Sequence, residues 1–421
     1  MAPPKLPPKG NTDSEDSEDA VDTPTTMAST DTTALPSSSP SLAEKAQRCR
    51  AALITALSPS EPVDTILLSG GLDTSIIADL APLTHLGLKQ AVTVVCTPTA
   101  PDEAYARAIA EKHSLKHTVV RCDDPMSLVG DEEGGTLETC VRVLKTFDPM
   151  ELRNAVVVAR ALVECKRMGA KVVATGDAAD ELFAGYSFLQ GLSPGKLKRW
   201  IARLSRPSVM RFCAGPLAAH LGLKVFQPFL APPVIDFALT CRRSDLIRSI
   251  PNPAPTKDTT PGEMTTFGKY VLREAVPEAY SRWRRKDPIE VGSGTTTLPK
   301  LFEEHTDPAF VEAEKARILR EDGVTIRDAE HLHYYGVFRR VFASDGAASA
   351  ENEDQDMDAR QYRLKALFAK CGIERYGDDP CLECGFQIDR LDSWFCVTCG
   401  AWPARTGSPE GDVQEGDDLD E

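Results

Sequence analysis

The protein has 421 residues and a formal net charge of −15, from 48 basic and 63 acidic side chains. The charge lies at the ends, since residues 1–40 carry −5 and residues 347–421 carry −11. Nucleic-acid-binding domains usually have a basic excess, so a nucleic-acid partner is disfavoured, although the basic stretch 196–203 could be a docking patch. No apolar run has the length of a membrane helix or signal peptide. We therefore expect a cytoplasmic or nuclear protein without a membrane partner.

The first 41 residues are rich in Pro, Ser, Thr and acidic residues. Such a segment buries too little apolar surface to offset the entropy lost on folding, so we predict a disordered acidic leader at 1–41. One large domain is predicted at 42–345, followed by a linker and a short helix at 346–375. A disordered acidic tail is predicted at 405–421.

The first part of the predicted domain alternates between strand and helix patterns, which is typical of an α/β fold with a parallel sheet. Residues 196–345 are predicted to be mostly helical. The predicted strands lie near 65–68, 92–96, 117–121 and 171–174, and the predicted helices lie at 43–57, 103–113 and 152–168.

A glycine pair, Gly70-Gly71, follows the first predicted strand and precedes a helical segment. Adjacent glycines at such a turn let backbone N–H groups approach a phosphate, whose charge the helix dipole favours. Asp73 lies in the same turn, where a carboxylate would repel phosphate unless it holds a cation such as Mg²⁺. The turn lacks the Gly-Lys-Ser/Thr ending of a Walker loop. Taken alone, the pattern could also be an ordinary glycine turn.

A second turn, after the apolar stretch near residue 174, is dense in carboxylates: Asp177, Asp180 and Glu181. Acidic residues at the start of a helix either favour its dipole at the surface or hold a metal ion. The second turn alone does not separate these two interpretations.

Together the two turns resemble a known family. Ser69-Gly-Gly-Leu-Asp-Thr-Ser75 is similar to the pyrophosphate loop of the N-type ATP pyrophosphatases. Thr175–Tyr186 resembles the Asp-Glu-Leu-Phe-x-Gly-Tyr signature of the asparagine synthetase synthetase domain. The resemblance extends over roughly residues 45–345 and implies an ATP pyrophosphatase-like domain with a helical second half. Further similar segments occur in the family's order at 147–153, 222–229, 267–273 and 283–286.

The resemblance implies an ATP-dependent, AMP-forming amide ligase. A carboxylate, with aspartate expected, would be activated as an acyl-adenylate, and ammonia would then displace AMP. Asp177 would be the base that takes a proton from ammonia, with Lys286 and Arg153 as catalytic cations. Asp73 and Asp180 would be Mg²⁺ ligands. The residues implied to bind ATP are Leu67, Ser69, Gly70, Gly71, Asp73, Thr74, Ser75, Val95 and Gly176.

Several positions depart from the family pattern. Asp177 replaces a glutamate, which shortens the side chain by one methylene, and Ala178 and Ala184 replace glycines. Met150 and Glu151 stand beside the expected arginine, where small hydroxyl residues are common. These changes lie around the expected acceptor acid and nucleophile, so they bear on the acceptor substrate more than on the activation of ATP.

Two Cys-x-x-Cys pairs, Cys381/Cys384 and Cys396/Cys399, are separated by eleven residues. This spacing is typical of a zinc ribbon, in which four thiolates hold a structural Zn²⁺. We predict such a ribbon at 376–404 and expect it to lose order without metal while the large domain stays folded. Buried or disulfide-bonded cysteines are the alternative.

Full-length members of the family begin with a glutaminase domain whose nucleophile is a terminal cysteine, whereas this chain has Ala2. We therefore expect the chain to use free ammonia, with a separate glutaminase or another protein docking through the ribbon or the tails. Two other classes stay open. One is a tRNA-modifying enzyme that adenylates a nucleobase, which co-purifying tRNA would favour. The other is a catalytically weakened interaction protein, suggested by Asp177, which absent nucleotide turnover would favour.

Overall fold

The computed structural model describes residues 40–206, 209–254, 262–344, 357–388 and 393–407. Almost all of the predicted leader, much of the predicted linker and most of the predicted tail lie outside these ranges. Among the helices that are described, none is long and apolar enough to cross a membrane.

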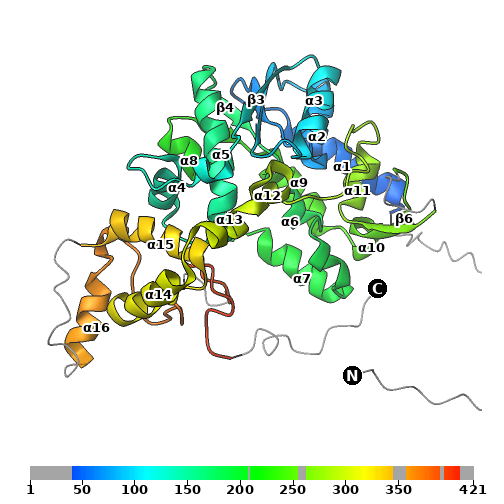
Figure 1. Ribbon diagram of the computed structural model, residues 1–421. Coiled ribbons are helices and arrows are strands. Elements are labelled where there is room, and N and C mark those ends of the chain that lie inside the picture. The colour runs from blue at the N-terminus through cyan, green and yellow to red at the C-terminus, as the bar shows by residue number, and fades with distance from the viewer. Residues whose placement is uncertain (1–39, 207–208, 255–261, 345–356, 389–392, 408–421) are drawn as a thin grey trace, which may run out of the picture. The chain divides into compact units, whose positions relative to one another are not determined.

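Five parallel strands form the central sheet, in the order β3-β2-β1-β4-β5 (Figure 1). The α/β class with a parallel sheet is thus confirmed, and β1 to β4 correspond to the four predicted strands. β5 lies in the part predicted to be mostly helical. The sequence did not predict this strand, because three residues are too few to show a strand periodicity. The strands are β1 (Thr65–Leu67), β2 (Gln90–Val95), β3 (Lys116–Arg121), β4 (Val172–Ala174) and β5 (Lys224–Phe226).

The sheet reverses its winding direction between β1 and β4. From β1 the chain builds outward through β2 to β3, and then returns to β4 on the other side of β1. Ligands of parallel sheets bind beyond the carboxyl ends of the strands at such a switch point. Both sequence motifs are the turns that leave these two strands, so the topology places them side by side.

Helices pack on both faces of the sheet, because successive side chains of a strand point to opposite faces. In β2, Ala91 belongs to one apolar cluster, while Val92 and Val94 belong to the other. The first cluster includes residues of α1 (Leu42–Ala56), α2 (Leu72–Leu80), α3 (Asp102–Lys112), α6 (Ala179–Leu182), α7 (Pro194–Leu204), α9 (Pro232–Leu239), α10 (Arg243–Leu246) and α11 (Tyr270–Ala275). The second includes residues of α4 (Thr136–Leu144), α5 (Pro149–Arg167), α8 (Ala214–His220), α13 (Leu298–His305), α14 (Pro308–Asp322) and α15 (Ala329–Phe342).

The predicted helices at 43–57, 103–113 and 152–168 correspond to α1, α3 and α5. An antiparallel pair, β6 (Arg248–Pro251) and β7 (Met264–Phe267), is a further departure from the predicted helical half. The remaining helices are α12 (Ile289–Ser293) and α16 (Met357–Ala366). Short 3-10 turns lie at Ala81–Leu83, Pro125–Leu128, Ser187–Gly191, Pro228–Leu230, Thr295–Thr297 and Ala369–Cys371.

The segment that holds the two cysteine pairs shares the second apolar cluster with the large domain. All four cysteines belong to this cluster, together with Phe147, Phe338 and Phe386. Phe338 of α15 packs against Phe386, with ring centroids 5.6 Å apart. The cysteine pairs are therefore packed against α15 rather than tethered at a distance.

Candidate nucleotide and acceptor site

The first glycine turn is held by contacts from a distant part of the chain. Gly70 has φ +71°, and a Cβ atom there would lie 2.6 Å from Cβ of Tyr105, so only glycine fits without a shift. Ser281 Oγ donates to the carbonyl of Gly70 at 2.6 Å, and Arg284 Nη1 donates to the carbonyl of Ser69 at 3.2 Å. The turn therefore has a fixed backbone, as a phosphate-binding loop requires.

The structure brings the residues implied to bind ATP to one edge of the sheet. Leu67 and Val95 end the neighbouring strands β1 and β2. Gly176 lies in the turn after β4, where a Cβ atom would be 3.0 Å from Cβ of Asp73, so the two turns are in close contact. The other implied residues form the first turn and the start of α2: Ser69, Gly70, Gly71, Asp73, Thr74 and Ser75.

The two carboxylates predicted to bind Mg²⁺ converge on one lysine. Lys269 Nζ donates to both oxygens of Asp73, at 2.7 and 2.8 Å, and lies 2.7 Å from Oδ1 of Asp180. Since both carboxylates contact the same nitrogen, they lie close together. Lys286 Nζ contacts the other oxygen of Asp180 at 3.0 Å, so two ammonium groups and two carboxylates form one group.

Burial and charge act in opposite directions on these groups. Burial raises the pKa of Asp73 above its usual value, against the attraction of Lys269. Burial would also raise the pKa of Asp180, but the ammonium groups of Lys269 and Lys286 outweigh it and lower that pKa. Burial would lower the pKa of Lys286, and the negative charge of Asp180 raises it instead. We infer that Lys286 and Asp180 are charged at neutral pH.

The donor set fits a divalent cation. Oδ1 of Asp180 forms an ion pair with Lys269 Nζ at 2.7 Å, and no described residue donates a hydrogen bond to this buried oxygen. Carboxylate oxygens are the ligands that Mg²⁺ prefers. Asp73 and Asp180 thus offer oxygen ligands for a cation, which would share these oxygens with the ammonium groups of Lys269 and Lys286.

The sequence by itself does not assign a role to Lys269. The segment 267–273 resembles the family, but no basic residue lies close to Asp73 or Asp180 along the chain. Lys269 has φ +55°, and its N–H donates to the carbonyl of Phe183 at 2.9 Å, which fixes it beside the second turn. Its position after Gly268 and directly before a helix is the only local signal of its role.

Asp177 is buried and takes two hydrogen bonds on one oxygen. Thr175 Oγ1 and Gln227 Nε2 donate to its Oδ2, at 2.7 and 2.8 Å. Burial raises the pKa of Asp177, although these hydrogen bonds act against it. Gln227, contributed by the loop after β5, was not singled out from the sequence. The two hydrogen bonds leave Oδ1 as the oxygen available to a nucleophile.

The two alanines that replace family glycines keep the glycine backbone. Ala178 has φ +79° and Ala184 has φ +55°, both in the left-handed region. A non-glycine residue there costs about 1–2 kcal/mol. The turn is therefore preserved at a local cost, and the loss of both glycines does not remove the geometry that places Asp177 and Asp180.

Arg153, which was predicted as a catalytic cation, contacts Pro149 and Glu330 rather than the group formed by Asp73, Asp180 and the two lysines. Its Nε donates to the carbonyl of Pro149 at 3.2 Å and lies 3.4 Å from Glu330 of α15. Glu151, in the same turn of α5, has its pKa raised to about 7 by burial and then by the charges of Asp148 and Asp177. Glu151 is thus near enough to Asp177 for the charge of Asp177 to raise its pKa, and we name Glu151, Arg153 and Asp177 the acceptor side.

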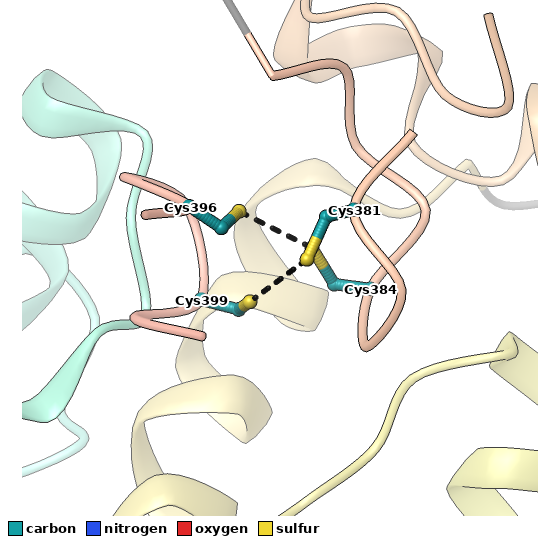
Figure 2. A group of neighbouring side chains, drawn as sticks. All are labelled: Cys381, Cys384, Cys396 and Cys399. Carbon is teal, nitrogen blue, oxygen red and sulfur yellow. Dashed lines mark hydrogen bonds between the residues drawn. The ribbon is translucent and has the colours of Figure 1, made fainter. Parts of the chain in front are cut away.

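Cys381, Cys384, Cys396 and Cys399 form a group with the dimensions of a metal centre (Figure 2). Their sulfurs lie within 4.8 Å of one another, and none forms a disulfide. The Cys381–Cys399 and Cys384–Cys396 sulfur distances are 3.7 and 3.6 Å. A tetrahedron of sulfurs about 2.3 Å from Zn²⁺ has edges of about 3.8 Å. The arrangement therefore fits a zinc ion.

Comparison with known proteins agrees with the two motifs. Residues 50–217 match the asparagine synthase family model. The chain is similar to an asparagine synthetase (glutamine-hydrolyzing) of Asparagus officinalis, 24% identical over 312 residues, covering 67% of this chain and 48% of the relative. It is also similar to asparagine synthetase B (glutamine-hydrolyzing) of Escherichia coli, 23% identical over 308 residues, covering 67% and 51%. The chain thus spans about half the length of these curated relatives.

Two solved structures also show a likeness, at TM-scores too low to establish a common fold. They are an NMN synthetase of Francisella tularensis (TM-score 0.23, 14% identity, 48% of this chain and 92% of that one) and a U34-tRNA thiolase of Methanococcus maripaludis (TM-score 0.26, 13% identity, 63% and 80%). The family match covers both motif turns and the start of α5. The part of the chain that holds both motif turns is therefore similar to the asparagine synthase family.

Proposed function

We propose that the protein is an ATP-dependent, AMP-forming amide ligase that activates an amino-acid carboxylate, with aspartate as the first candidate. The observation that carries this proposal is the convergence of Asp73, Asp180 and Lys269 beside the fixed glycine turn. It lies at the switch point of the sheet, and Asp73 and Asp180 are inside the residues that match the family model, whereas Lys269 follows them in the chain. Acids and ammonium groups in this arrangement suit the triphosphate of a metal–nucleotide complex.

In this proposal the chain supplies positive charge where pyrophosphate leaves. Lys286 is the more exposed of the two lysines, with 30% of its side chain accessible against 3% for Lys269. Lys286 would therefore contact the leaving phosphates, while Lys269 holds the two carboxylates in place. Mg²⁺, held by Asp73 and Asp180, would neutralise phosphate charge. Preorganised donors of this kind often account for most of the rate enhancement of an enzyme.

On the acceptor side, Asp177 would act as the base. Ammonia that attacks the acyl-adenylate must lose a proton, and Oδ1 of Asp177 is the oxygen that Thr175 and Gln227 leave available. Its raised pKa makes it a stronger base than an ordinary aspartate. The C–N bond forms as the bond from the acyl carbon to AMP breaks, and the proton passes to Asp177.

The test is exchange of labelled pyrophosphate into ATP, measured with the purified full chain. Each amino acid, and separately bulk tRNA, is added as the candidate substrate. Exchange that depends on one amino acid would support the proposal and name the acceptor. Exchange that depends on tRNA would replace it with nucleobase adenylation. Absence of exchange with every addition would contradict it in favour of a protein without adenylation activity.

We further propose that the chain by itself uses ammonia and not glutamine. With ammonium chloride, the rate of amide formation should rise as the pH approaches about 9, which is near the pKa of ammonia. Unprotonated NH₃ is the species that attacks the acyl carbon. Formation of AMP and amide is compared between ammonium chloride and glutamine. Glutamine that supports turnover as well as ammonia does, in protein free of contaminating glutaminase, would contradict this.

The four cysteines are proposed to hold one structural Zn²⁺ per chain. Metal analysis of the purified protein should give a zinc-to-protein ratio near one, and Cys396→Ser should lower it. Because the sulfurs share the second apolar cluster with Phe147 and Phe338, the substitution should also lower the free energy of unfolding of the large domain. A disulfide found by mass spectrometry at any of the four cysteines would contradict the assignment.

A further inference from the structure

We propose that the four-cysteine centre is a positioning element of the active site, because it holds the turn 146–148 that starts α5. The proposal rests on the function proposed above for the acceptor side. It assigns the positioning to Thr146, Phe147 and Arg327, which bind the backbone of the segment Cys396–Cys399, and Arg327 also contacts the side chain of Glu383. We call Cys381–Cys384 the first knuckle and Cys396–Cys399 the second knuckle.

The second knuckle binds the turn through its two central residues. The N–H of Phe147 donates to the carbonyl of Thr398 at 2.8 Å. Thr146 Oγ1 donates to the carbonyl of Val397 at 2.8 Å and lies 3.1 Å from that of Thr398. Both carbonyls lie between the two cysteines of the knuckle, so their positions depend on whether the sulfurs are held together.

The same knuckle packs over the N-terminal cap of α5. Asp148 caps the helix by accepting from the N–H of Met150 at 3.2 Å, and its own N–H donates to Thr146 Oγ1 at 3.0 Å. Gly400, next to the knuckle, has φ +78°, and a Cβ atom there would lie 2.2 Å from Oδ1 of Asp148. Movement of the knuckle would therefore disturb the cap of α5 directly.

Arg327 joins the two knuckles at the other side. Its Nη1 contacts Glu383 of the first knuckle at 3.0 Å, and its Nη2 donates to the carbonyl of Cys399 at 2.7 Å. Four residues further on, the ring of His331 stacks on Phe147, with centroids 5.2 Å apart. The knuckles, the turn 146–148 and the start of α15 thus form one packed unit.

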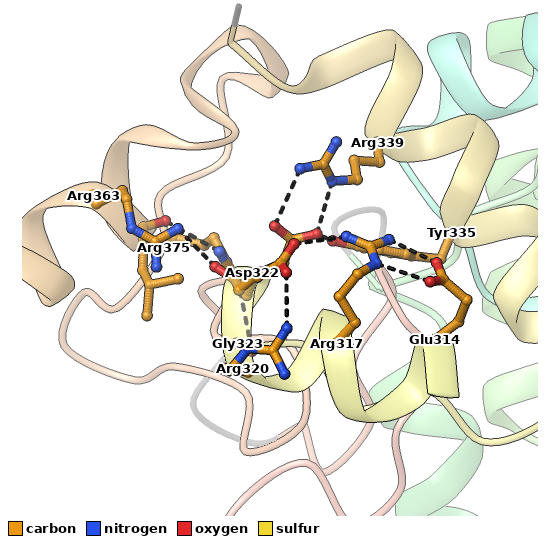
Figure 3. A network of polar contacts seen from close by, with 11 residues as sticks. Glu314, Arg317, Arg320, Asp322, Gly323, Tyr335, Arg339, Arg363 and Arg375 are labelled. Atoms are coloured by element: carbon orange, nitrogen blue, oxygen red, sulfur yellow. Dashed lines mark hydrogen bonds and ion pairs between the residues drawn. The ribbon is translucent and has the colours of Figure 1, made fainter. Parts of the chain in front are cut away.

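The first knuckle is fixed by a second arginine, Arg375, which is buried. Arg375 donates to the carbonyl of Cys384 at 2.8 Å. It also donates to the carbonyl of Asp322 at 2.8 Å (Figure 3). The carboxylate of Asp322 in turn accepts from the hydroxyl of Tyr335 at 2.7 Å and from Nε of Arg339 at 2.8 Å. The first knuckle is therefore attached to α14 and α15. The second knuckle contacts the turn 146–148 directly, and the metal would join the two knuckles.

The link reaches the acceptor side within one and a half turns of helix. Glu151 and Arg153 follow the cap of α5 directly, and Arg153 bridges to Glu330 of α15 at 3.4 Å. The turn and these residues lie within 50–217, which match the family model, whereas all four cysteines lie outside that match. The four-cysteine centre thus lies outside the residues that match the family model and contacts a segment that lies inside them.

The first test uses the full-length, zinc-loaded protein and reads hydrogen exchange by mass spectrometry, without any assay of activity. Removal of zinc with a chelator should raise exchange of peptides from 146–153 by at least tenfold, together with those from 381–404. Peptides from 69–80 should be unchanged. Increased exchange confined to 381–404 would overturn the proposal, and so would purified protein that carries no zinc.

The second test separates positioning from stability. Thr146→Val removes the hydrogen bond to the knuckle and leaves all four cysteines, so zinc content should stay near one per chain. We expect the KM of the carboxylate substrate to rise about tenfold while the KM of ATP stays the same. The matched control is Thr240→Val, since Thr240 Oγ1 donates to a carbonyl of its own helix, α9, at 2.7 Å.

Two results of the second test would overturn the positioning role: an unchanged KM for the carboxylate, or equal changes in both KM values. Arg327→Gln provides a second variant if Thr146→Val folds poorly, and it should give the same split. Should no carboxylate support turnover, the proposed function fails, while the exchange of 146–153 on zinc removal still decides whether the four-cysteine centre holds the turn.

Discussion

The site has a nucleotide half around Asp73 and Asp180 and an acceptor half, which is the acceptor side with Glu151 and Asp177. Both halves bury carboxylates, but the surroundings affect the charge of these carboxylates in opposite directions. Around the glycine turn, Asp73 and Asp180 share the ammonium groups of Lys269 and Lys286. Around the start of α5, burial raises the pKa of both Glu151 and Asp177, and the donors that Asp177 has among the described residues, Thr175 and Gln227, are neutral. The first arrangement suits a ligand that brings its own anion and cation, and the second suits proton transfer.

This difference predicts opposite effects of neutralising substitutions. In the nucleotide half, loss of one charge leaves an opposite charge buried without its partner. In the acceptor half, loss of a carboxylate removes a group whose charged form is costly to bury. Three substitutions test the comparison, and they are taken in order of expected effect.

The largest effect is expected for Lys269→Met. Lys269 is 3% exposed and contacts both Asp73 and Asp180, so its loss leaves two neighbouring buried carboxylates with one ammonium group. Removal of one partner from a buried ion pair costs about 3–5 kcal/mol. The free energy of unfolding, measured by urea titration at pH 7, should fall by that amount.

The double variant Lys269→Met/Asp73→Asn is the control for Lys269→Met. The double variant should recover part of the stability lost in Lys269→Met, because it removes one of the two unpaired carboxylates. A loss below about 1 kcal/mol in the single variant, or no recovery in the double variant, would mean that the two carboxylates are not held by this lysine.

The second effect is on the rate. Asp180→Asn keeps the shape of the side chain and removes the charge that two lysines contact. Pyrophosphate exchange should fall by about 10²–10³-fold, the loss typical of one preorganised electrostatic group. Asp236→Asn, on the exposed side of α9, is the control and should exchange at the normal rate. Normal exchange in Asp180→Asn would remove Asp180 from the site, and with it the proposed metal role.

The sequence was sufficient for the two turns of the nucleotide half, because each turn is a local motif. The turns around Gly70 and Gly176 follow short apolar strands, and the parallel pairing of β1 with β4 brings them together. The family resemblance, confirmed by the match over 50–217, also covered them. The Mg²⁺ roles of Asp73 and Asp180 stay predictions, since their geometry shows convergence and not coordination.

The acceptor half depends on contacts that no local pattern contains. Gln227 reaches Asp177 across 50 positions of sequence. The nucleotide half contains such a contact as well, since Lys269 reaches Asp73 across 196 positions. Thr146 contacts a carbonyl that lies 251 positions away. The cysteine spacing predicted the ribbon residues themselves, but a spacing cannot tell which surface a ribbon packs against. Such pairings are set by tertiary packing, so only the structure reveals them.

The smallest effect is expected for Glu151→Gln, and its sign distinguishes the two halves. The pKa of Glu151 is about 7 in the folded protein, above the ordinary value of 4.5, because of burial and of the charges of Asp148 and Asp177. A raised pKa means that folding favours the protonated acid. Its contribution to stability is complete below about pH 4.5 and is lost as the pH rises through 7.

Glutamine cannot ionise, so the variant avoids that loss. At pH 8, Glu151→Gln should be more stable than the parent by about 1–3 kcal/mol, with the difference vanishing near pH 4.5. Glu164→Gln on the same helix is the matched control, because its hydrogen bonds to Arg167 lower the pKa of Glu164 and no gain is expected at pH 8. Urea titrations at pH 4.5, 6, 7 and 8 measure both variants. A loss of stability at pH 8 in Glu151→Gln would mean that Glu151 is paired with a cation as Asp180 is, and the contrast between the two halves would no longer hold.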